Sequence, residues 1–131
     1  KCAASFAGVT DIDAQLKSNR TSFAATRYFR QWRTKVQGEA NVDLRTVSPL
    51  AQAAKLKAPV LIVHGEEDET VSVKQGKQMV AALEANKADV TSKFYKHGGH
   101  NFSSTEDLAD FLRLLEPFWP SIIPPDKLMF E

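Results

Sequence analysis

The residues best suited to chemistry are acids and a histidine that follow two apolar segments. An aliphatic run at 60–63 is followed by four consecutive carboxylates at 66–69. A second segment, at 90–95, is followed by a glycine pair and then by His100. An imidazole can take a proton from a hydroxyl nucleophile and return it to a leaving group, provided that a carboxylate holds the ring in the useful tautomer. These positions therefore favour acid–base catalysis.

A parallel sheet would bring these side chains together. The run at 60–63 reads V-L-I-V, which is typical of a strand buried on both faces of such a sheet. The segment at 90–95 carries polar residues at 91–93, so it is expected nearer to the sheet edge. Because open α/β folds place their sites at the carboxyl ends of strands, the acids and His100 are predicted to meet there.

Two motifs, in this order, resemble those of a known enzyme family. H-G-x-x-D-x-x-V begins at His64, and G-H ends at His100. An acid after one strand and a histidine after the next is the chain order of the last two triad members in α/β-hydrolases. The pair resembles the C-terminal part of the catalytic domain of the prolyl oligopeptidase family of serine peptidases. A-G-V-T-D at 7–11 is similar to the strand after the nucleophile elbow of that family, so the resemblance spans nearly the whole chain.

The resemblance implies roles for four residues. It selects Asp68 among the four acids as the triad carboxylate, and it makes His100 the general base. It also implies that Thr70 and Val71 border the pocket for the residue before the scissile bond. The alternatives for such residue types are a solvated carboxylate or a structural histidine, and we assign these to Glu66, Glu67, Glu69, His64 and His97.

The nucleophile of such a triad is missing from the sequence. The elbow motif G-x-S-x-G occurs nowhere in the 131 residues. We therefore expect residues 1–131 to form a partial α/β-hydrolase (peptidase) catalytic domain, the C-terminal half of that fold, with three mostly parallel strands and flanking helices. The nucleophile-bearing N-terminal half would lie outside this chain. Alone, the chain is predicted to be inactive, and to self-associate or to remain bound to that half.

Peptide-bond hydrolysis in short peptides, through a Ser-Asp-His triad, is the leading interpretation of function. A carboxylesterase fragment of the same fold is the nearest alternative, because the placement of acid and histidine barely distinguishes esters from amides. A non-catalytic assembly half-domain is the alternative from another class. The implied partners are a peptide substrate and the nucleophile-bearing half, while dipeptidyl, prolyl, acylaminoacyl and endo-oligopeptidase specificity all stay open.

Composition argues against several other classes. With 17 basic and 16 acidic residues the net charge is +1, which gives no electrostatic case for nucleic acid or an anionic membrane. No apolar run approaches the roughly 20 residues of a membrane span. Cys2 is the only cysteine, so neither an intrachain disulfide nor a C-x-x-C metal site can form. We expect no cofactor and no metal, and the compartment, cytoplasm or periplasm, stays open.

The N-terminal part of the chain carries weaker structural signals. A first strand at 1–9 is expected mainly from the resemblance, because alanine disfavours strands. Asp11 is interpreted as a helix cap. A helix is predicted at 22–37, and Ser48 with the following proline is predicted to open a short helix.

The remaining helices are predicted from clearer patterns. A helix at 73–85, with Ser72 as its cap, is expected to turn Gly76, Val80 and Leu83 toward the sheet. A capping box, S-S-T-E at 103–106, starts the last helix. Its apolar stripe is predicted to be core and consists of Leu108, Phe111, Leu112, Leu115, Phe118 and Trp119.

Overall fold

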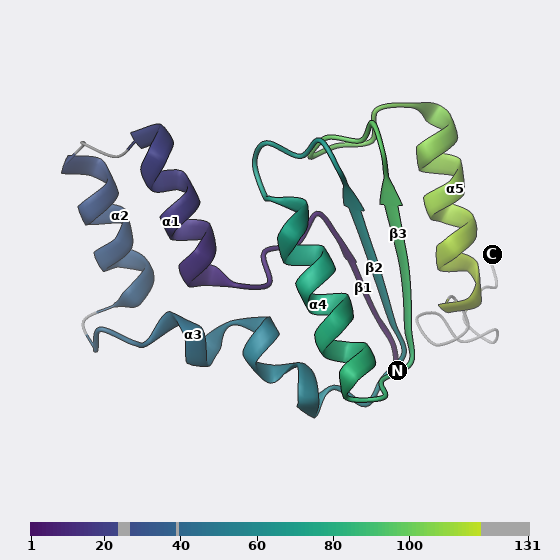
Figure 1. Ribbon diagram of the computed structural model, residues 1–131, viewed down its shortest axis with the longest axis horizontal. Helices are drawn as coiled ribbons and strands as arrows, with labels where there is room; N and C mark the ends of the chain where they lie inside the picture. Colours follow the sequence, from purple (N-terminus) through teal and green to yellow (C-terminus); the bar gives the residue numbers. More distant parts are fainter. Residues whose placement is uncertain (24–26, 39, 119–131) are drawn as a thin grey trace, which may run out of the picture.

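The computed structural model of this chain describes residues 1–23, 27–38 and 40–118. Its centre is a parallel sheet of three strands, β1 (Ala3–Phe6), β2 (Val60–Gly65) and β3 (Val90–Tyr95), in the order β1-β2-β3 (Figure 1). The expected parallel sheet is therefore confirmed. Because all three strands run the same way, the loops that follow β2 and β3 emerge at one edge of the sheet.

The central position of β2 follows from its sequence. All six of its residues are buried, as expected for an aliphatic strand that is covered on both faces. β3 exposes residues 91–93, which agrees with its place at an edge of the described sheet. β1 is shorter than the predicted strand at 1–9, because Ala7 adopts a positive φ of 49° and the chain leaves the extended conformation there.

Helices cover both faces of this sheet. On one face, Val60 and Ile62 of β2 pack against Val80 and Leu83 of α4 (Val73–Ala85). On the other face lie α5 (Thr105–Leu115) and the short 3-10 helix η2 (Glu116–Phe118). There Leu61 and Val63 of β2 belong to a second cluster. Its aromatic members come from both ends of the chain and are Phe6, Phe102, Phe111 and Phe118. The layered arrangement is visible in Figure 1, with α4 and α5 on opposite sides of the strands.

The structure corrects the prediction of one helix at 22–37. Two helices occur instead, α1 (Ile12–Phe23) and α2 (Arg27–Gln37), and residue 22 lies inside the first of them. α1 begins directly after Asp11, whose Oδ1 accepts a hydrogen bond of 3.0 Å from the N–H of Ala14. Asp11 is therefore the helix cap that its sequence position predicted. The sequence of α1 is mostly polar, so its spacing of apolar residues does not indicate a helix.

Between α2 and β2 the chain forms α3 (Leu44–Val47) and the 3-10 helix η1 (Pro49–Lys55). The predicted opening of a short helix at Ser48 is confirmed, but Ser48 makes no side-chain cap. Its hydroxyl donates instead to the carbonyl of Leu44 at 2.6 Å and accepts from the N–H of Ile12 at 3.0 Å. Ser48 thereby ties α3 to the start of α1.

The boundaries of α4 agree with the sequence pattern, and Ser72 accepts from the N–H of Lys74 at 3.4 Å as the predicted cap. α5 is also present, but its cap is Ser104, which accepts from the N–H of Asp107 at 3.0 Å. The cap therefore lies one residue later than in the predicted box, which pairs Ser103 with Glu106. The described helices include none that is long and apolar enough to cross a membrane.

The predicted core stripe of α5 is wrong for two of its members. Leu108 is 40% exposed and Leu112 is 55% exposed, whereas Phe111 and Leu115 pack against the sheet. Successive residues of a helix are about 100° apart, so Leu112 lies well outside the arc centred on Phe111. Trp119 lies outside the described residues.

Candidate active site

Two loops at the carboxyl ends of β2 and β3 form one connected structure. The N–H of Glu66 donates to the carbonyl of Tyr95 at 2.8 Å, and the N–H of Glu67 donates to the carbonyl of Gly98 at 2.9 Å. These backbone bonds continue the pairing of β2 with β3 beyond the ends of the strands. They fix the acidic loop relative to the loop that carries His100.

Gly65 makes this close approach feasible. A Cβ atom at that position would collide with the backbone carbonyls of Gly98 and Gly99. Backbone atoms cannot move aside as the end of a flexible side chain can, so any larger residue must separate the two loops. The H-G pair of the sequence motif thus has a steric basis.

Gly65→Ala is expected to destabilise the chain by about 1–3 kcal/mol, the usual cost of forcing extra atoms into a packed region. Gly99→Ala is the matched control, because a Cβ there would meet nothing within 4 Å, and its effect should stay within about 0.5 kcal/mol. Urea denaturation followed by circular dichroism measures both. Equal unfolding midpoints for the two variants would contradict the proposed role of Gly65.

The two loops bring Asp68 and His100 together. Nδ1 of His100 lies 2.9 Å from Oδ2 of Asp68. The Asp68 side chain is fully buried, whereas the His100 ring remains 41% exposed. Because a carboxylate only accepts hydrogen bonds, Nδ1 carries the proton, and Nε2 of the neutral ring presents its lone pair. This is the tautomer that can take a proton from a nucleophile.

The Asp68 carboxylate is held in its ionised form. Burial disfavours the charge, but hydrogen bonds from the N–H of Val71, from His100 and from the N–H of Thr70 outweigh burial and hold the pKa below its usual value of 3.8. Both backbone N–H groups donate to Oδ1 at 2.8 Å. Asp68 is therefore ionised at neutral pH.

His64 is a further contact of this carboxylate, and its part in the site was missed in the sequence. It is 1% exposed, and its Nε2 lies 2.8 Å from the carbonyl oxygen of Val71 and 3.3 Å from Oδ2 of Asp68. Since the carbonyl can only accept, Nε2 carries the proton. A Cβ at Gly76 would stand 2.9 Å from Nδ1 of His64, so α4 can lie against the ring only because residue 76 is glycine. His64 is thus a structural histidine, as predicted, that also supports Asp68.

A second histidine–carboxylate pair lies in the same loops but is solvated. Nδ1 of His97 is 3.0 Å from Oε1 of Glu67, and the two side chains are 78% and 62% exposed. Glu66 pairs with Lys77 of α4 at 2.7 Å, and Glu69 is exposed. Of the four acids in this loop, Asp68 alone is buried.

The residues predicted to border the substrate pocket lie beside Asp68. Thr70 is exposed and the Val71 side chain is 4% exposed. Both residues contact Asp68 through their backbone N–H groups. Their contact with a substrate stays a prediction.

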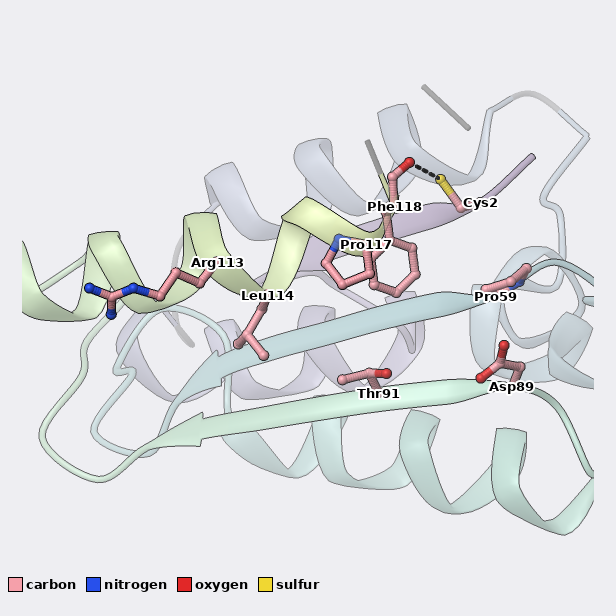
Figure 2. A pocket seen from close by; sticks show the side chains of 8 residues that line it. All are labelled: Cys2, Pro59, Asp89, Thr91, Arg113, Leu114, Pro117 and Phe118. Atoms are coloured by element: carbon pink, nitrogen blue, oxygen red, sulfur yellow. Dashed lines mark hydrogen bonds between the residues drawn. The ribbon is translucent and has the colours of Figure 1, made fainter. Parts of the chain in front are cut away.

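A cavity of about 340 Å³ lies at the opposite edge of the sheet. Figure 2 shows its lining, which includes Cys2, Pro59 and Asp89, the residues that directly precede β1, β2 and β3. The thiol of Cys2 points to the carbonyl of Phe118 at 3.7 Å. This cavity is remote from Asp68 and His100 and takes no part in the candidate site.

The fold of this chain is that of part of an α/β-hydrolase domain, and solved structures share it. A puromycin-hydrolysing peptidase of Mycobacterium tuberculosis has a TM-score of 0.70 and 23% identity, covering 100% of this chain and 19% of that protein. An acylaminoacyl peptidase of Pyrococcus horikoshii has a TM-score of 0.70 and 22% identity, covering 100% of this chain and 22% of that protein.

The sequence profile of the prolyl oligopeptidase family matches residues 1–122, and the chain belongs to this family. Dipeptidyl aminopeptidase BIII of Pseudoxanthomonas mexicana is 28% identical over 122 residues, which cover 89% of this chain. The chain spans only 17% of the length of that relative. The resemblance found in the two motifs is therefore confirmed.

Proposed function

We propose that this chain supplies two members of the catalytic triad of a serine peptidase. Asp68 is the triad carboxylate and His100 is the general base. The observation that supports it best is the bond of 2.9 Å between a buried carboxylate and a half-exposed imidazole. The solvated pair of His97 and Glu67 lacks this combination, because neither partner is buried.

In the proposed reaction, Nε2 of His100 takes the proton of a serine hydroxyl while the serine oxygen attacks the carbonyl carbon of a peptide bond. The imidazolium then gives this proton to the leaving amine, and the C–N bond breaks to leave an acyl-enzyme. Water, deprotonated by His100 in turn, releases the acid product and frees the serine. Asp68 stays ionised throughout and stabilises the imidazolium.

The serine would come from a segment outside residues 1–131. In the described sheet β1 pairs with β2 on one side only, and its residues Ala3 and Ala4 are exposed. A strand added parallel to β1 would have its carboxyl end beside Asp68 and His100. We propose that the nucleophile-bearing strand occupies this position. Self-association of the isolated chain is the competing way to cover the unpaired side of β1, and light scattering would test it.

Hydrolysis by the complete protein of which this chain is part tests the function. Short aminoacyl and peptidyl p-nitroanilides should be cleaved. For each substrate, kcat/KM is divided by the rate of uncatalysed hydrolysis, and this ratio should be larger for the anilides than for matched p-nitrophenyl esters. Cleavage of the esters alone would favour a carboxylesterase. If neither substrate class reacts, a non-catalytic assembly role replaces the proposal.

A further inference from the structure

A chain of buried side-chain amides runs from the end of β1 to the loop of Asp68. Oε1 of Gln75, on α4, accepts from the N–H groups of Thr10 and Asp11 at 2.8 and 2.9 Å. Nε2 of Gln75 donates to Oε1 of Gln15 at 2.8 Å, and Nε2 of Gln15 donates to the carbonyl of Thr70 at 2.8 Å. Gln75 is 4% exposed and Gln15 is 8% exposed.

The direction of this chain of hydrogen bonds is fixed at both ends. At one end two backbone N–H groups require an acceptor, so the oxygen of the Gln75 amide must point to them. Its NH₂ group therefore faces Gln15, whose oxygen must turn toward Gln75. The NH₂ group of Gln15 is left to face the carbonyl of Thr70, which can only accept. Neither amide can flip without placing two donors or two acceptors against each other.

This chain of hydrogen bonds ends at Thr70, the residue whose N–H is hydrogen-bonded to the Asp68 carboxylate. The carbonyl of Thr70 is held by Gln15, while the N–H of Thr70 donates to Oδ1 of Asp68 at 2.8 Å. Thr10 adds a further tie, since its hydroxyl donates to the carbonyl of Gln75 at 2.9 Å. The segment after β1, the helix α4 and the acidic loop are thus joined through two glutamine side chains.

We propose that Gln15 and Gln75 are positioning residues for the catalytic pair, acting through Thr70 on the place of the Asp68 carboxylate. This inference rests on the proposed function. The hydrogen bonds described above lead from the two glutamines to the backbone of the acidic loop, so both residues act on Asp68 through that backbone. Because a small displacement of a catalytic group can cost up to a hundredfold in rate, their removal should lower turnover more than substrate binding.

The test uses Gln15→Leu in the complete protein. We expect kcat to fall about tenfold to a hundredfold with KM changed by less than about threefold. The far-downfield proton resonance of Nδ1–H of His100 should shift or broaden in this variant, because the position of its acceptor has changed. Gln15→Met, with an unbranched side chain of similar length, provides the same test should the leucine variant fail to fold.

Gln52→Leu is the control for a glutamine elsewhere in the fold. Gln52 also donates its amide to a backbone carbonyl, that of Thr46 at 2.7 Å, but this bond is exposed and links η1 to α3. Its replacement should leave kcat, KM and the His100 resonance unchanged. A fall in kcat with Gln52→Leu equal to that with Gln15→Leu would show a general effect of lost stability and would overturn the inference.

A double variant tests whether Gln75 acts through Gln15 in this chain of hydrogen bonds. If Gln75 acts on Thr70 only through Gln15, Gln75→Leu added to Gln15→Leu should lower kcat no further than Gln15→Leu alone. Independent, multiplicative losses would contradict this.

If Asp68→Asn and His100→Ala abolish turnover while Gln15→Leu and Gln15→Met keep normal kcat, this inference alone fails. If Asp68→Asn itself keeps normal turnover, the proposed function fails first.

Discussion

Asp68→Asn and His100→Ala, each in the complete protein, are expected to lower kcat by roughly three to six powers of ten. An asparagine at 68 could still accept from the N–H groups of Thr70 and Val71, but its NH₂ group would face Nδ1 of His100. That donor would select the other tautomer of the ring, which cannot take a proton at Nε2. Alanine at 100 removes the base altogether.

The second pair in the same loops supplies the controls. Glu67→Gln and His97→Ala change the same residue types at a similar separation of 3.0 Å, but in an exposed pair. Exposed ion pairs contribute little to stability, so both variants should keep near-normal kcat and unfolding midpoints. Near-normal turnover by Asp68→Asn or His100→Ala, or a loss in the control variants as large as in these two, would show that the catalytic pair is wrongly assigned.

The isolated chain of residues 1–131 is expected to show no serine-hydrolase activity. Without the nucleophile, rate falls by several orders of magnitude, and the backbone N–H after that serine, an oxyanion donor, is absent as well. Incubation of the purified chain with a fluorophosphonate probe should give no stoichiometric adduct by mass spectrometry. The complete protein, treated in parallel, should gain one adduct per chain. Stoichiometric labelling of the isolated chain would contradict the expectation.

The parts of the fold that local patterns determine were predictable. The aliphatic run gave β2, and helical spacing with the cap at Ser72 gave the bounds of α4. α1 was missed because its sequence is mostly polar, so its periodicity is weak. The exposure of Leu112 depends on how α5 lies across the sheet, which spacing along one helix does not determine.

The part of the candidate site that short sequence motifs determine was also predictable. Asp68 and His100 could be selected because both belong to short motifs that follow strands. Gln15 and Gln75 carry no such signal, since glutamine is common on helices and their contact joins residues 60 positions apart. His64 gave a partial signal through its spacing of four residues from Asp68. Its bond to the carbonyl of Val71 depends on the fold of the loop.

A crystal structure of the complete protein after reaction with a fluorophosphonate tests the central proposal most directly. We expect the adduct on a serine of a G-x-S-x-G motif outside residues 1–131. Nε2 of His100 should lie within about 2.6–3.2 Å of the modified serine oxygen, with Nδ1 still bonded to Asp68. An adduct on a residue within this chain, or a different imidazole beside the modified serine, would contradict the assignment of Asp68 and His100.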